Sequence, residues 1–158
     1  MAMLGRTRNK RQLDIFEVPI ERFINRDHEF AIGADNIDWE SLEEHFKPFY
    51  APKGRPSVPP RKIIGMILLK ERFSLSDEKV LKIWPENPYW QYFCGEVHFQ
   101  TTKPFSVGEL TRFRRRIGNE GIEMIRNISI KQFGKSDGKT YDSYSDRKKK
   151  NFWKKIIG

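Results

Sequence analysis

The sequence has very little cysteine: Cys94 is the only one in 158 residues, so a disulfide within the chain is impossible. This favours a reducing cytoplasm, because disulfides are typical of oxidising compartments. The three histidines, His28, His45 and His98, are scattered and have no cysteine partners, so no zinc-site spacing occurs. We therefore expect no metal centre and no cofactor.

Long apolar runs are also absent. The densest one extends from Ile63 to Leu69 and is broken only by Gly65, whereas a membrane-spanning helix needs about 20 apolar residues. No segment resembles a signal peptide, so we expect no membrane partner. Because the run leaves almost no polar face, it predicts a buried core helix around which the other helices pack.

Acidic residues are in the minority. The chain has 21 aspartates and glutamates but 30 lysines and arginines, so its net charge is +9. The excess is uneven: residues 1–11 carry +4 and residues 131–158 carry +6, whereas residues 12–50 carry −7 and residues 51–130 carry +6. A basic surface with basic ends suits a polyanion such as nucleic acid. The alternative is a basic protein whose charge serves solubility alone.

The middle of the chain shows apolar residues at helical spacing and residues that can cap helices. Asp38 is placed to cap a helix whose apolar residues, from Trp39 to Phe49, recur at steps of three and four. Ser76 is a similar cap, and Pro85 ends the helix that it starts. The predicted helical segments are residues 21–25, 28–37, 39–50, 76–84, 89–95, 106–118 and 119–133, together with the core helix, which starts at the prolines before Arg61 and contains residues 63–69. This pattern predicts an all-α, compact multi-helix domain.

The segment from Ser106 to Gly118 carries the strongest indication of function. Ser106 and Glu109 have the spacing of a capping box, which marks the start of a helix. On a helix with about 100° per residue, the apolar residues form one narrow stripe: Leu110, Phe113 and Ile117. Gly118 ends this helix and Asn119 can cap the next one. The two consecutive helices are compatible with a helix-turn-helix-like unit.

Four arginines lie on the same segment. Arg112, Arg115 and Arg116 share the face opposite the apolar stripe, and Arg114 flanks the stripe. Arginine suits phosphate because its planar fork can donate two parallel hydrogen bonds. The arrangement predicts DNA contact. The alternative is a solvated basic face that the acidic helices at residues 28–50 partly neutralise.

Three further cations are candidate phosphate contacts: Lys103, Arg61 and Lys62. Arg61 and Lys62 follow Pro60 at the start of the core helix, where the helix dipole disfavours positive charge. They either point into water or meet an anionic partner.

Aromatic residues are concentrated between residues 84 and 93. Such side chains can stack on bases, but at helical spacing beside a core helix they are more often part of the core. If exposed, they would instead form a surface for association with other proteins. The residues concerned are Trp84, Tyr89, Trp90 and Phe93.

Several short motifs occur in a fixed order. They are Gly54-Arg55-Pro56, the apolar helix, Leu75-Ser76-Asp77, Asn87-Pro88-Tyr89-Trp90-Gln91-Tyr92-Phe93-Cys94-Gly95 and Phe113-Arg114-Arg115-Arg116-Ile117-Gly118. Over about residues 14–134, this set resembles the N-terminal, InsH-type domain of bacterial insertion-sequence transposases of the IS-five group. The resemblance implies a helical domain for assembly and for recognition of double-stranded DNA at the element's terminal inverted repeats.

The resemblance also implies that full-length relatives continue into a ribonuclease-H-like domain, whose Asp-Asp-Glu triad holds two divalent metals for strand cleavage. The residues after Gly134 are too few for such a domain, and their aspartates match no family motif. We therefore expect a flexible basic arm at residues 1–12, a DNA-binding domain at residues 13–134 and a disordered, truncated or frame-shifted tail at residues 135–158, with no catalytic activity.

A second hypothesis is a protein-interaction module. A domain without catalytic residues could join full-length transposase and inhibit it, because transposases assemble as multimers. The aromatic cluster at residues 84–93, if exposed, would serve this association, and a strictly monomeric species in light scattering would count against it.

Overall fold

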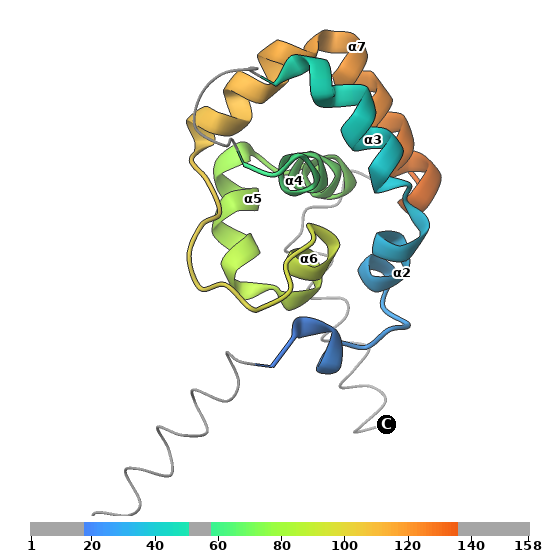
Figure 1. Ribbon diagram of the computed structural model, residues 1–158, viewed down its shortest axis with the longest axis vertical. Coiled ribbons are helices and arrows are strands. Elements are labelled where there is room, and N and C mark those ends of the chain that lie inside the picture. Colours follow the sequence, from blue (N-terminus) through green and yellow to red (C-terminus); the bar gives the residue numbers. More distant parts are fainter. Residues whose placement is uncertain (1–17, 51–57, 136–158) are drawn as a thin grey trace, which may run out of the picture.

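The computed structural model describes residues 18–50 and 58–135, and within these ranges it contains helices and no strand. This confirms the predicted all-α class. The α-helices are α2 (Glu29–Asn36), α3 (Trp39–Phe46), α4 (Pro60–Phe73), α5 (Asp77–Ile83), α6 (Pro88–Phe93) and α7 (Val107–Phe133), and three short 3₁₀ helices accompany them: η1 (Ile20–Arg22), η2 (Lys47–Phe49) and η3 (Trp84–Glu86) (Figure 1). The predicted basic arm and nearly all of the predicted tail lie outside the described residues.

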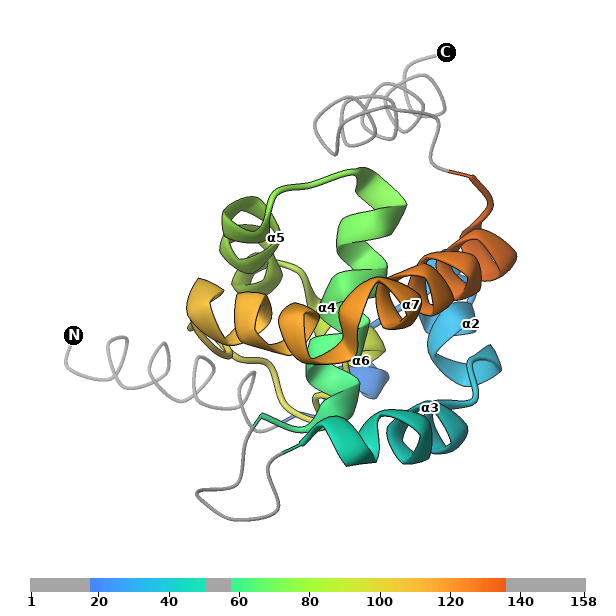
Figure 2. The same cartoon turned by 90° about the horizontal axis from the view of Figure 1, so that it is seen from above.

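Helix α4 is the centre of the core. Every residue from Ile63 to Leu69 is buried, and α3, α5 and α7 all pack against this helix. Figure 2 shows α4 in the middle of the molecule, with α7 crossing it. The helix starts with Pro60, whose missing N–H is not needed in the first turn, and it ends at Ser74, which has a left-handed conformation with φ of 53°.

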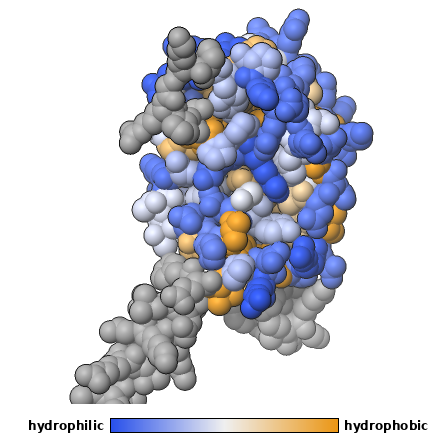
Figure 3. All heavy atoms as spheres, in the orientation of Figure 1, coloured by the Kyte–Doolittle hydropathy of each residue, from blue (hydrophilic) through white to orange (hydrophobic). Residues whose placement is uncertain are grey.

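Three of the predicted helix caps are present. Asp38 accepts the N–H of Ser41 at 3.1 Å, and the Oγ atoms of Ser76 and Ser106 accept N–H groups at 3.2 Å and 3.3 Å. The second half of the predicted capping box differs, because the Glu109 carboxylate accepts a hydrogen bond from Arg112. Polar residues cover most of the face shown in Figure 3, as expected when each amphipathic helix turns its apolar side to α4.

Two boundaries differ from prediction. The short helix expected at residues 21–25 is the 3₁₀ helix η1, and α3 stops at Phe46, with η2 taking up the next three residues. Pro48 lies in η2, where it removes a backbone N–H that a continuing α-helix would need. Phe49, expected on the buried face, is therefore 37% exposed.

Gly118 divides α7 into two halves. The φ of 66° and ψ of −175° at Gly118 are non-helical and kink the helix, and Figure 1 shows the resulting change of direction. The predicted helix end at Gly118 is thus confirmed as a kink. A helix-turn-helix unit has a turn of three or four residues, whereas the turn here is a single glycine.

Replacing Gly118 by alanine is expected to destabilise the fold by about 1–3 kcal/mol, because this backbone region is accessible almost only to glycine. The new Cβ would meet no atom within 4 Å. Any loss of stability would therefore come from backbone strain and not from a steric clash. Urea unfolding of Gly118→Ala measures it. Gly108→Ala in the same helix is the control: Gly108 has no positive φ, and its Cβ would meet only side-chain atoms at 3.6 Å or more, so we expect no loss of stability. Equal stability of the two variants would contradict the kink.

Candidate nucleic-acid interface

The first half of α7, residues 107–117, is held by its apolar face. Leu110, Phe113 and Ile117 are all at most 4% exposed. The ring of Phe113 packs at 6.1 Å from that of Phe46 and at 5.7 Å from that of Tyr50. The predicted apolar stripe is therefore confirmed as the buried side, and the opposite side of this half-helix faces away from the core.

The arginines of this half-helix differ in their surroundings. Arg112, Arg115 and Arg116 are exposed, as the helical wheel predicts. Arg112 forms an ion pair with Glu109 one turn earlier, and such exposed pairs contribute little to stability. Among the residues that the structure describes, Arg115 and Arg116 form no ion pair or hydrogen bond. Two neighbouring guanidinium groups are thus available to an anionic partner.

Arg114 belongs to a different arrangement. Its guanidinium donates a hydrogen bond to Asp77 Oδ2, and the Lys70 Nζ donates to Asp77 Oδ1 at 2.8 Å. The Asp77 side chain is only 13% exposed. One carboxylate therefore ties the end of α4 and the first half of α7 to the start of α5. The sequence places Asp77 only as a first-turn acidic residue, and nothing in it links positions 37 residues apart.

The other predicted cations also differ. Lys103 is exposed in the loop that leads to α7. Lys62 forms an ion pair with Glu96 in which both side chains are mostly buried. The Arg61 guanidinium lies 4.6 Å from the centre of the Trp39 ring, and its Nε donates to the carbonyl of Phe93 at 3.4 Å. Burial lowers the pKa of Arg61. Arg61 and Lys62 thus have partners within the protein.

The aromatic cluster is part of the core. Trp84, Trp90 and Phe93 are fully buried, and Tyr89 is half-buried with its ring stacked on His28 at 3.9 Å between centroids. The three buried rings cannot stack on bases or meet another protein unless the domain unfolds. These four residues therefore do not form an exposed aromatic surface in the described structure.

The described residues give no indication of a metal centre or a reactive nucleophile. No group of three or more histidine, cysteine or acidic side chains in these ranges could hold a metal ion. Cys94 is buried, and burial raises the pKa of its thiol to about 12. A thiol in this state is inert near neutral pH because the thiolate is the nucleophile.

Removing the carboxylate of Asp77 is expected to cost about 1.5–3 kcal/mol of unfolding free energy, as for other hydrogen bonds to charged groups. Both Lys70 and Arg114, each no more than 26% exposed, would lose their partner. Urea unfolding of Asp77→Ala measures the loss. Glu78→Ala is the matched control, because Glu78 is exposed in the same helical turn. A loss no greater than that of the control would show that the three helices do not depend on Asp77.

The raised pKa of Tyr50 predicts that the protein loses stability at alkaline pH. Burial, with a smaller contribution from Glu43, raises its pKa from 10.0 to about 12, and Arg116 opposes the change. The unfolded chain therefore loses this proton first, so stability is complete below pH 10 and falls as pH rises toward 12. Tyr50→Phe should flatten the pH dependence of the unfolding free energy in this window. An unchanged slope would exclude a buried Tyr50 hydroxyl.

None of the helices in the described ranges combines the length and apolar character that a membrane crossing requires. The family model described as a transposase domain (DUF772) matches residues 18–116, well over half of the chain. This match includes all four arginines of the first half of α7 and ends just before Gly118.

A Rhizobium meliloti protein, described as uncharacterized protein ORF8 in the nfe locus, is 38% identical over 117 residues. These residues are 74% of this chain and 56% of the relative, so the chain spans little more than half of the relative's length. No solved structure matches the chain. Because the family model covers most of the described helices, the chain belongs to the transposase domain (DUF772) family.

Proposed function

We propose that this domain binds double-stranded DNA during transposition, at the terminal inverted repeats of its element, through the exposed side of residues 107–117. The observation that carries the proposal is the pair Arg115 and Arg116. Both are exposed and form no ion pair or hydrogen bond among the described residues, while the opposite side of their helix is fixed in the core. Adjacent like charges repel, so this arrangement gains stability when phosphate supplies a counter-charge.

Two further cations complete the proposed contact surface. Arg112 is 54% exposed, and its ion pair with Glu109 is weak enough to be exchanged for one with phosphate. Lys103 is exposed just before the helix starts. Three other cations, Arg61, Lys62 and Arg114, are left out of the proposed contacts because their charges already have partners within the protein.

The proposed role is recognition of DNA rather than cleavage. The family relationship supports a role in transposition, and the arginine side of α7 supports DNA as the ligand. Base-edge contacts by arginine in the major groove would give sequence preference, while Lys103 would contact phosphate only.

The double variant Arg115→Ala plus Arg116→Ala is expected to bind DNA more weakly and with less salt dependence. Each lost phosphate contact lowers the slope of log K against log salt by about 0.9, so the slope should fall by roughly 2. Fluorescence anisotropy at several salt concentrations measures it, with one duplex carrying the terminal repeat and one carrying the same bases scrambled. Tighter binding of the intact protein to the repeat at every salt is expected.

The matched control is Arg22→Ala plus Lys47→Ala. It removes the same amount of charge from exposed residues of η1 and η2, so the long-range field changes equally while the proposed surface stays intact. We expect its salt slope to stay close to that of the unmodified protein. If both double variants lose the same slope, or if the arginine variant loses none, the first half of α7 is not the DNA-binding surface.

A further inference from the structure

Asn119 is the first residue after the kink at Gly118, and its side chain is exposed. Asparagine is a common helix cap, and the sequence places Asn119 where it could cap the second half of α7, residues 119–133. In the described part of the chain, however, its side-chain amide forms no hydrogen bond, so it does not act as a cap there. The donor and the acceptor of this amide are therefore both available to an outside partner.

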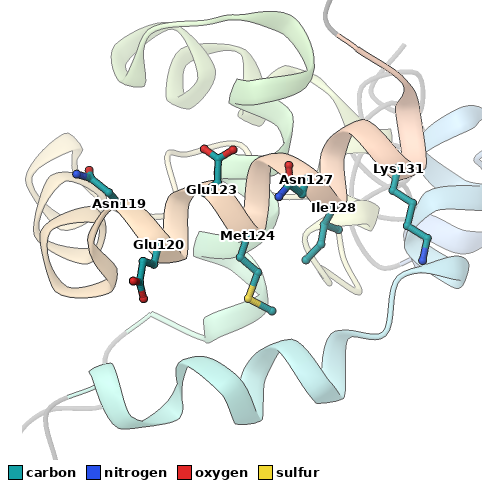
Figure 4. A pocket seen from close by; sticks show the side chains of 7 residues that line it. All are labelled: Asn119, Glu120, Glu123, Met124, Asn127, Ile128 and Lys131. Carbon is teal, nitrogen blue, oxygen red and sulfur yellow. The ribbon is translucent and has the colours of Figure 1, made fainter.

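Asn119 lies on the side of α7 that is turned away from α3. Figure 4 shows its amide directed away from α3, whereas Met124 is directed toward α3, where it borders an open groove. In the first half of α7, Phe113 packs against Phe46 of α3. Arg115 is two residues further on, about 160° around the helix from Phe113, so it is also turned away from α3. Asn119 and Arg115 thus lie on the same side of α7, on either side of the kink.

The charge along α7 changes sign at Asn119. The exposed arginines of the first half precede it, and two exposed acidic residues, Glu120 and Glu123, follow it. Arginine attracts phosphate and carboxylates repel it, so the DNA-binding surface is expected to end near Asn119. A neutral amide attracts phosphate less strongly than arginine does, but its donor and acceptor match the edge of an adenine.

We propose that Asn119 determines sequence specificity by reading an adenine in the major groove, an inference that rests on the DNA binding proposed above. The amide oxygen accepts a hydrogen bond from the N6 amino group of adenine, and the amide nitrogen donates one to N7. Arg112, Arg115 and Asn119 follow one another at steps of three and four and cover about 10 Å of helix axis. This length corresponds to roughly three base pairs, so the adenine lies at one end of a short contact with the arginines.

The preference for adenine follows from the pattern of donors and acceptors on each base. Guanine presents two acceptors in the major groove, so the amide oxygen of Asn119 would face another acceptor with no hydrogen between them. Thymine presents one acceptor beside a methyl group, and cytosine presents one donor, so neither can form both hydrogen bonds. Only adenine satisfies both groups of the amide, whereas the arginines favour guanine or phosphate.

Substitution of Asn119 by alanine tests the proposal. The terminal-repeat duplex is changed by one base pair at a time, and fluorescence anisotropy gives the affinity of the full chain for each duplex. We expect the unmodified protein to prefer adenine at one position by about 5- to 150-fold, the range of one good bidentate contact. Asn119→Ala should bind all four base pairs at that position equally and keep its preferences elsewhere. Its salt slope should not change, because no charge is lost.

Two further variants separate base reading from a structural effect. Asn119→Gln retains an amide that can form both hydrogen bonds with adenine, so it should keep the preference at the same position. Asn127→Ala makes the same change at another exposed asparagine of α7, beyond Glu123, and should leave every affinity unchanged. Thermal unfolding of each variant checks that these exposed substitutions leave the fold intact.

Three results would overturn the inference. They are an unmodified protein without base preference at any position, an Asn119→Ala variant with all preferences intact, and an Asn119→Ala variant that binds every duplex more weakly by the same factor. If Arg115→Ala plus Arg116→Ala loses salt slope while Asn119→Ala keeps all preferences, DNA binding stands and only base reading by Asn119 fails. If the arginine variant keeps its slope, the proposed function fails and this inference fails with it.

Discussion

The burial of α4 is the constraint on which the rest of the structure depends. A helix whose residues from Ile63 to Leu69 are all apolar has no side that tolerates water, so other helices must cover it on every side. Gly65 allows one of these contacts to be very close, since a Cβ there would lie 2.9 Å from the Cys94 sulfur. Each covering helix turns its apolar side inward, and this requirement places the arginines of α7 on the outside.

The two halves of α7 share one helix but have separate roles in this arrangement. The first half packs against Phe46 and Tyr50 through Phe113. Asp77 of α5 joins it to α4 by pairing with both Arg114 and Lys70. The second half is tied to α4 by Arg126, whose Nε donates to Glu71 at 3.1 Å, and it borders the groove. Gly118 separates the halves because only glycine adopts its backbone conformation at low cost.

Local signals explain which parts of the fold were predictable. A capping side chain accepts a hydrogen bond from a backbone N–H only three residues further along the chain. Asp38, Ser76 and Ser106 therefore mark helix starts that the structure contains. The wheel of residues 106–118 identified the buried stripe for the same reason. Tertiary contacts caused the errors about which charges have partners. The wheel places Arg114 beside the apolar stripe but gives it no partner, and only the approach of α5 brings Asp77 to it.

By itself, the sequence determined the helical class, the central position of α4 and the side of α7 that carries exposed arginine, because apolar spacing and capping are properties of neighbouring residues. The tertiary structure decided which charges have partners. It paired Lys62 with Glu96 and buried the aromatic residues that could have stacked on bases. It also left Arg115 and Arg116 exposed, with no ion pair or hydrogen bond in the described ranges. Which charges form ion pairs depends on contacts between residues far apart in the chain. The periodicity of the sequence does not indicate those contacts.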